Sequence, residues 1–184
     1  GGNAENVAYN INDFQALFSD RTVYLVNYRG YGGSSGSPHE EGLYSDALVV
    51  YDHFIKLHST ISTMGRSIGA AVATYLASKR DVEKLILVTP FDSAVNVAKK
   101  LYWFFPIDLI LKERLDTAGS AANITVDTLI ITAANDRIIP HSCTLDLIKA
   151  FRKTGVEAVT LENTGHNTVH FHPDYKKIIA SFMR

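Results

Sequence analysis

The 184-residue sequence predicts an α/β fold, in which helices cover both faces of a mostly parallel β-sheet. Nearly continuous runs of β-branched and apolar residues, typical of strands buried on both faces, occur at 22–27, 84–89 and 128–133. Stretches with apolar residues at helical spacing lie between these runs. Strands that alternate with helices form parallel sheets, so the order of elements itself predicts the fold class.

The composition indicates one globular domain over residues 1–184. With 46% hydrophobic residues, the chain is large enough to form its own core. The 18 basic and 19 acidic residues give a net charge of −1 without a charged block, which argues against a nucleic-acid partner. No stretch reaches the roughly eighteen apolar residues of a membrane span. The single cysteine, Cys143, has no internal disulfide partner.

The first forty residues predict a helix, a strand and a loop. Apolar residues recur at helical spacing over 7–18, with Asn3 or Asn6 as the N-cap. The strand at 22–27 leads into the glycine-rich loop 28–38. This loop lacks the G-x-G-x-x-G spacing of a dinucleotide site and the lysine of a phosphate-binding loop. We therefore expect no cofactor, and a mobile loop beside an active site.

The remaining elements alternate regularly, with one exception. Shorter strands are expected at 60–64 and 158–161, and helices at 40–58, after residue 67 to Lys79, at 142–153 and at 173–184. The segment 91–123 is too long for a simple connection and has a helical pattern of its own. An insertion of this size is typical of a lid or a binding element.

Residues 65–69 read Gly-Arg-Ser-Ile-Gly and separate a predicted strand from a predicted helix. That context is the one a nucleophile elbow requires. The turn is so tight that side chains two positions before and after the central residue would collide, which explains the glycines. Ser67 is therefore expected to be an exposed nucleophile, rather than part of a merely structural turn.

A serine hydroxyl needs a base, and the base needs an orienting acid. Asp136 follows the strand at 128–133, and His166 follows the strand at 158–161. Because the carboxyl ends of parallel strands share one edge of the sheet, Ser67, Asp136 and His166 are expected to converge there as a catalytic triad. Their order along the chain is that of α/β-hydrolases.

The chain resembles an α/β-hydrolase-fold serine hydrolase, esterase- or thioesterase-like, with a small helical lid. The resemblance covers essentially the whole chain and rests on NYRGYGGSSGSP at 27–38, GRSIG at 65–69, NDRIIP at 135–140 and TGHN at 164–167. It implies acyl transfer to water through an acyl-enzyme on Ser67. It also implies an oxyanion hole formed by the Ile68 amide and a second amide from Gly2 or Asn3.

The resemblance further implies that the strands identified here are numbers four to eight of an eight-stranded sheet in the order 1-2-4-3-5-6-7-8. The third strand would end just before Gly1 and lie between the strands at 22–27 and 60–64. We therefore expect about fifty or more residues upstream of Gly1. Direct pairing of 22–27 with 60–64 would contradict that expectation.

The aromatic run at 102–105 has three interpretations. Its rings pack against the body of the protein, line an apolar substrate pocket or touch a membrane surface. For the pocket, the candidate residues are Tyr31, Trp103 and Phe104.

Several other residues are candidates for a role in or near the site. Asp92, after the strand at 84–89, is the alternative acid. His170 and His172 form an H-x-H pair without the carboxylate pattern of a zinc site, so no metal is expected. Arg66 is expected to pair with a nearby carboxylate, His141 to lie on the surface at a helix start, and Cys143 to be packed.

These observations predict a serine hydrolase acting on small-molecule or lipid-like esters or thioesters. An amidase or peptidase with the same triad is the enzymatic alternative, and a catalytically silent hydrolase-like binding module is the other. The expected location is the cytoplasm, unless an upstream segment carries an anchor or a signal.

Overall fold

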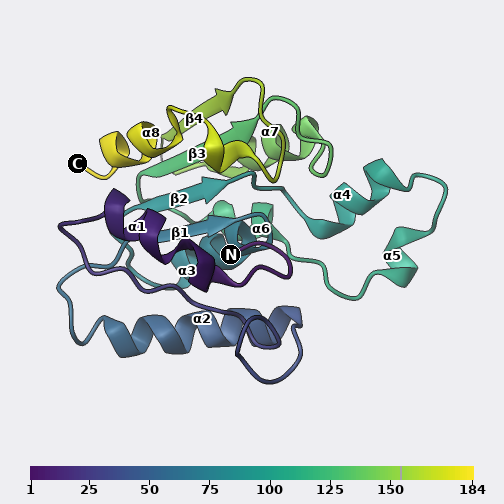
Figure 1. Cartoon of the computed structure of the whole chain (residues 1–184). Helices are drawn as coiled ribbons and strands as arrows, with labels where there is room; N and C mark the ends of the chain where they lie inside the picture. The colour runs from purple at the N-terminus through teal and green to yellow at the C-terminus, as the bar shows by residue number, and fades with distance from the viewer. Residues whose placement is uncertain (154) are drawn as a thin grey trace.

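The computed structural model describes residues 1–153 and 155–184, and its centre is a parallel sheet (Figure 1). Its strands are β1 (Thr63–Arg66), β2 (Leu85–Val88), β3 (Thr128–Ala133) and β4 (Val156–Leu161), which lie side by side in that order. All three neighbouring pairs are parallel. Because the strands are parallel, the chain leaves all of them at the same edge of the sheet.

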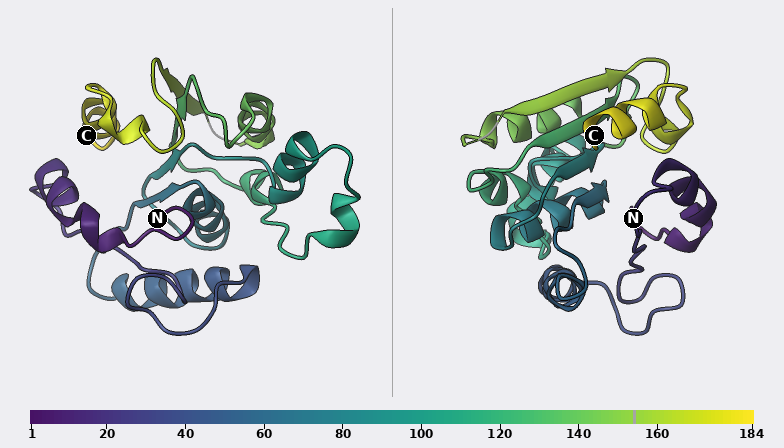
Figure 2. Two further views of the ribbon diagram at one scale, coloured as in Figure 1. Left: turned by 45° about the vertical axis from the view of Figure 1, so that its right-hand side comes forward. Right: turned by 90° about the vertical axis from the view of Figure 1, so that its left-hand side faces the viewer.

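Helices cover both faces of the sheet (Figure 2). On one face, Ile86, Val88 and Ile131 pack against α8 (Tyr175–Phe182), with the end of α1 (Ile11–Leu17) beside them through Leu17. On the other face, Leu85, Leu87 and Ile130 pack against three helices. These are α3 (Ile68–Lys79), α6 (Thr117–Ala121) and α7 (His141–Ala150). The strands β2 and β3 are buried along their whole length, as their apolar runs predict.

Most predicted elements are present, with shifted ends. The strand at 128–133 has the predicted bounds, whereas the strand expected at 60–64 forms as β1, which begins three residues later and ends two residues later. The long helix α2 (Glu40–Phe54) packs on α3, with Tyr44 stacked on Tyr75 at 4.0 Å between ring centroids. The expected helix at 7–18 is divided into η1 (Val7–Asn10) and α1. Asn6 caps it by accepting a hydrogen bond from the Ala8 N–H.

The prediction of a strand at 22–27 is wrong. The segment forms no ladder, although its side chains alternate between half-buried and exposed as in an extended chain. A cavity of ≈ 550 Å³, lined by apolar side chains that include Leu25, Met64 and Ile86, lies between this segment and β1. A strand needs a neighbour within about 5 Å for its backbone hydrogen bonds, and the cavity separates the two segments. Direct pairing of 22–27 with 60–64 is therefore not observed.

The segment 91–123 contains α4 (Ala94–Leu101), α5 (Ile107–Ile110) and α6. While α6 packs against the sheet, α4 and α5 project from one side of the molecule (Figures 1 and 2). The projection is closed at its base by a hydrogen bond from the Ala94 N–H to the Arg114 carbonyl, 2.9 Å long. Over the described ranges, none of the helices is both long and apolar enough to cross a membrane.

Candidate active site

Ser67 occupies the sharp turn between β1 and α3, but it is only 8% exposed, so the expectation of an exposed serine is wrong. Its backbone angles, φ 54° and ψ −117°, lie outside the regions that L-residues normally adopt, and such strain costs about 1–3 kcal/mol. Two glycines make the turn sterically feasible: a Cβ at Gly65 would lie 2.0 Å from the Gly69 carbonyl oxygen. A hydrogen bond of 2.9 Å from the Ser67 N–H to the Val88 carbonyl holds the turn against β2.

Asp136 and His166 are in direct contact. Asp136 follows β3 and His166 follows β4, and Asp136 Oδ2 lies 2.8 Å from His166 Nδ1. Two backbone hydrogen bonds hold the two loops together, from the Ala134 N–H to the Leu161 carbonyl (3.0 Å) and from the Asn135 N–H to the Thr164 carbonyl (2.9 Å). Both side chains leave the sheet at the edge where Ser67 follows β1.

The surroundings of Asp136 keep it ionised. Burial raises the pKa of its carboxyl group, but the hydrogen bonds from His166 and from the Ile139 and Ile138 N–H groups outweigh burial, so the pKa lies below its usual range. The two backbone donors reach Oδ1 at 2.8 and 2.9 Å. Because an ionised carboxylate only accepts hydrogen bonds, His166 must donate from Nδ1. In the neutral imidazole, Nε2 is then the nitrogen whose lone pair can accept a proton.

The first residues of the chain lie over the elbow. A Cβ at Gly69 would lie 2.5 Å from the Gly1 carbonyl oxygen, and a Cβ at Gly2 would lie 3.1 Å from the Arg66 guanidinium. The loop that carries Gly2 and Asn3 is thus adjacent to the turn that carries Ser67 and Ile68. These are the residues expected to supply the oxyanion donors.

Glu5 fastens this loop. Its carboxylate accepts the Gly2 N–H and the side-chain amide of Asn10 and lies 3.6 Å from the Arg66 guanidinium. Burial raises the pKa of Glu5, but these partners outweigh burial and bring it below its usual range. The prediction that Arg66 pairs with a nearby carboxylate is confirmed. Sequence reasoning missed Glu5 itself, because no local pattern reveals a contact across sixty residues.

The donors expected at the oxyanion hole differ in their present partners. The Gly2 N–H is bonded to Glu5, so it is not free. Asn3 receives a hydrogen bond of 2.5 Å on its side-chain oxygen from the Tyr31 hydroxyl. Neither the Asn3 nor the Ile68 N–H has a recorded hydrogen bond to any described residue. Within residues 1–153 and 155–184, no hydrogen bond joins Ser67 Oγ to His166 either.

The three residues expected in the substrate pocket are not together. Tyr31 packs on the cluster that contains Tyr28 and Val72 and has Ile68 at its margin, so it lies beside the elbow. Trp103 and Phe104 are 82% and 62% exposed on the projecting segment. In this structure, therefore, these two rings do not line a pocket.

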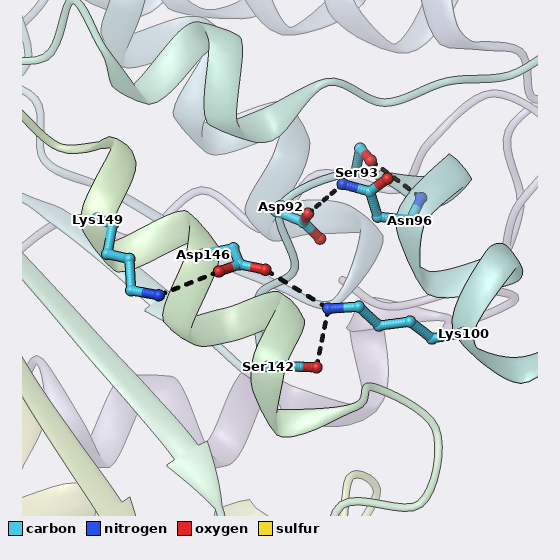
Figure 3. Close-up of polar contacts among 7 residues, drawn as sticks. All are labelled: Asp92, Ser93, Asn96, Lys100, Ser142, Asp146 and Lys149. Carbon is cyan, nitrogen blue, oxygen red and sulfur yellow. Dashed lines mark hydrogen bonds and ion pairs between the residues drawn. The ribbon is translucent and has the colours of Figure 1, made fainter.

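The alternative acid, Asp92, is buried but does not contact His166. Its Oδ2 accepts a hydrogen bond from Asn96, and its Oδ1 has no recorded partner among the described residues (Figure 3). Nearby Cys143 is fully buried, and burial raises the pKa of its thiol to about 11. At neutral pH Cys143 is therefore an inert packed thiol.

The other histidines lie outside this contact. His141 is exposed and begins α7. His170 contacts the Phe171 ring at a tilt of 44°, and His172 accepts the Asp174 N–H. The described part of the chain contains no group of three His, Cys, Asp or Glu side chains arranged to hold a metal ion.

The chain is similar in sequence to known proteins. No family model matches the chain. Human alpha/beta hydrolase domain-containing protein 17B is 31% identical over 172 residues, which cover 88% of this chain and 56% of that protein. An uncharacterized protein of Mycobacterium tuberculosis is 31% identical over 150 residues, 79% of this chain and 53% of its own length. The chain thus spans about half the length of these curated relatives.

Solved structures extend the similarity. The crystal structure of Paleococcus ferrophilus monoacylglycerol lipase matches with a TM-score of 0.71 at 14% identity, covering 99% of this chain and 89% of that one. At such low identity the match establishes the fold alone. The shared fold, the parallel sheet and the sequence similarity to the human relative together show that the chain belongs to the α/β-hydrolase superfamily.

Proposed function

We propose that this protein is a serine hydrolase that cleaves carboxylic esters or thioesters, with Ser67 as nucleophile, His166 as general base and Asp136 as orienting acid. The observation that carries the proposal is the contact of 2.8 Å between Asp136 Oδ2 and His166 Nδ1, at the sheet edge where Ser67 stands in a strained turn. A base held by an ionised acid, at the sheet edge that carries a serine in a nucleophile turn, is the arrangement that nucleophilic catalysis requires.

The reaction proceeds in two halves. His166 Nε2 takes the proton of Ser67 Oγ as that oxygen attacks the acyl carbon and forms a tetrahedral intermediate. The C–O or C–S bond to the leaving group then breaks, and His166 returns the proton to the departing alcohol or thiol. A water molecule, deprotonated by His166, attacks the acyl-enzyme. Ser67 recovers its proton and the carboxylic acid leaves.

The oxyanion is stabilised by backbone N–H groups at the junction of the elbow and the N-terminal loop. The Ile68 N–H belongs to the first turn of α3, where backbone N–H groups have no partner within the helix. Such groups can donate hydrogen bonds to a developing negative charge. Of the two loop residues, Asn3 is the better second donor, because the Gly2 N–H is bonded to Glu5. The role of Gly2 is then to anchor the loop.

Small-molecule or lipid-like acyl esters are the proposed substrates. The similarity to a monoacylglycerol lipase supports an ester rather than a peptide bond. The segment 91–123 leaves the sheet at the same edge as Ser67 and is proposed as the lid. An amidase would use the same triad, so the leaving group is decided by comparing an ester and an amide that share one acyl chain.

A fluorophosphonate probe tests the catalytic proposal against a silent binding module, because it reacts only with an activated serine. Wild type should be labelled, and Ser67→Ala should not. Ser181→Ala is the matched control, since this serine is exposed on α8 and far along the chain from the site. Failure to label wild type, or equal labelling of Ser67→Ala, would reject the proposal.

A further inference from the structure

The projecting segment ends in an apolar tip, residues 101–110. Of the 16 large hydrophobic side chains that are exposed in the described part of the chain, seven lie within these ten residues. They are Leu101, the aromatic run 102–105, Leu109 and Ile110, and Leu109 is 87% exposed. The aromatic rings contact one another, with Phe104 and Phe105 centroids 4.6 Å apart. Such a concentration of exposed apolar groups marks an interaction surface.

The segment around this tip has a net positive charge, whereas the chain as a whole is slightly negative. Residues 94–115 contain four basic and two acidic residues, whereas the whole chain has a net charge of −1. Both acids are engaged: Asp108 lies 2.6 Å from Lys99 and 3.7 Å from Arg114, and Glu113 accepts the backbone N–H of Glu40. Lys112 is exposed and has no recorded ion pair with a described residue. The residues that flank the tip therefore carry surplus positive charge, although the only charged residue within the tip is Asp108.

We propose that the tip at 101–110 docks the protein on an anionic phospholipid surface. Tryptophan and tyrosine favour the boundary between headgroups and acyl chains, where an apolar ring body and a polar edge are both accommodated. Flanking cations add attraction to anionic headgroups. An anionic membrane matches both the aromatic tip and its basic flanks. An apolar groove on another protein would match only the tip, because it offers no anionic groups to the basic residues.

The attachment of the segment favours a defined orientation on that surface. Lys100, at the end of α4, donates to Ser142 Oγ (2.8 Å) and lies 3.5 Å from Asp146, so α4 is fastened to α7 (Figure 3). The α7 helix begins directly after the loop that carries Asp136. Docking would therefore bring the catalytic edge of the sheet toward the membrane. The docking itself does not depend on catalysis.

The chain contains its own reporter of docking, because Trp103, 82% exposed, is the single tryptophan in the sequence. With phosphatidylcholine vesicles that contain phosphatidylglycerol, Trp103 emission should shift to shorter wavelength, and the protein should sediment with the vesicles. Vesicles of phosphatidylcholine alone, or high salt, should give a weaker response. Emission that is unchanged by anionic vesicles would overturn the proposal, whether or not Ser67 is labelled by the probe.

Paired variants locate the docking surface. Phe104→Ser with Leu109→Ser should abolish sedimentation, while Val49→Ser with Leu57→Ser, at 65% and 63% exposed positions outside the tip, should not. Lys112→Glu should weaken binding to anionic vesicles only. Binding that survives in the tip variant would overturn the proposal. So would an emission shift that appears with rising protein concentration and without vesicles, because it would indicate self-association.

Discussion

Asp136 and His166 meet through a hydrogen bond of 2.8 Å between Oδ2 and Nδ1, although thirty residues separate them along the chain. The contact exists because β3 and β4 are parallel neighbours in register, so the loops that follow them leave the sheet side by side. The remaining oxygen of Asp136 is held by two backbone N–H groups. The carboxylate is therefore fixed from both sides, and the imidazole takes its orientation from it.

Replacing this acid should remove most of the activity. In Asp136→Asn the amide no longer requires Nδ1 of His166 to be the donor, so the productive tautomer is lost. In serine proteases such a change lowers kcat on the order of 10⁴-fold. The measurement is kcat for a soluble activated ester. Asp92→Asn is the matched control and should change kcat far less; the reverse result would identify Asp92 as the acid.

The same carboxylate should make stability depend on pH. The pKa of Asp136 is lowered in the folded state from the ordinary value of 3.8, so its contribution is present above that value and is lost as pH falls through the folded-state pKa. The free-energy difference of unfolding between wild type and Asp136→Asn should therefore be largest near neutrality and shrink below about pH 4. Urea denaturation of both proteins, near neutral pH and below about pH 4, measures this difference. A difference that grows toward acid pH would contradict the direction, and Asp20→Asn, at an exposed site, provides the comparison.

Gly65 should not tolerate a side chain. A Cβ there would lie 2.0 Å from the Gly69 carbonyl oxygen, and that oxygen is backbone and cannot rotate away. Gly65→Ala should cost about 1–3 kcal/mol of unfolding free energy or more, as other overpacked sites do, and should abolish probe labelling. Gly33→Ala is the control, because a Cβ at Gly33 meets nothing within 4 Å. Equal stability of the two variants would refute the tight turn.

Glu5 should act as a positioning residue for the oxyanion loop. Glu5→Gln removes the charge that holds the Gly2 N–H and Arg66, so the Asn3 amide should lose its alignment with the developing oxyanion. Because that contact strengthens in the transition state, kcat should fall about tenfold or more with little change in KM. Glu162→Gln, at an exposed position, is the matched control. A raised KM with unchanged kcat would assign the loop to substrate binding instead.

The sequence was informative where local pattern and topology agree. The run at 128–133 predicts β3 residue for residue, because a strand buried on both faces needs an unbroken apolar run. The meeting of Asp136 with His166 follows from the rule that parallel strands end at one edge. Both inferences use features that neighbouring residues carry by themselves.

The sequence did not predict the features that depend on contacts between residues far apart along the chain. Residues 22–27 have the composition of a strand, yet a strand forms only beside another, and a cavity lies where a neighbour would be. Trp103 and Phe104 have the hydrophobicity of pocket residues, but hydrophobicity does not say which way an insertion faces. Glu5 was overlooked because its partner, Arg66, lies beyond any local window.

The most direct measurement is the site of acylation. The protein should be mixed with an activated ester, quenched in acid within the first turnover, digested and analysed by mass spectrometry. The acyl group should be found on the peptide that contains Ser67 and should disappear in Ser67→Ala. Turnover of the ester with the acyl group on another residue, or with Ser67 unmodified while Ser67→Ala remains active, would contradict the proposed role of the elbow.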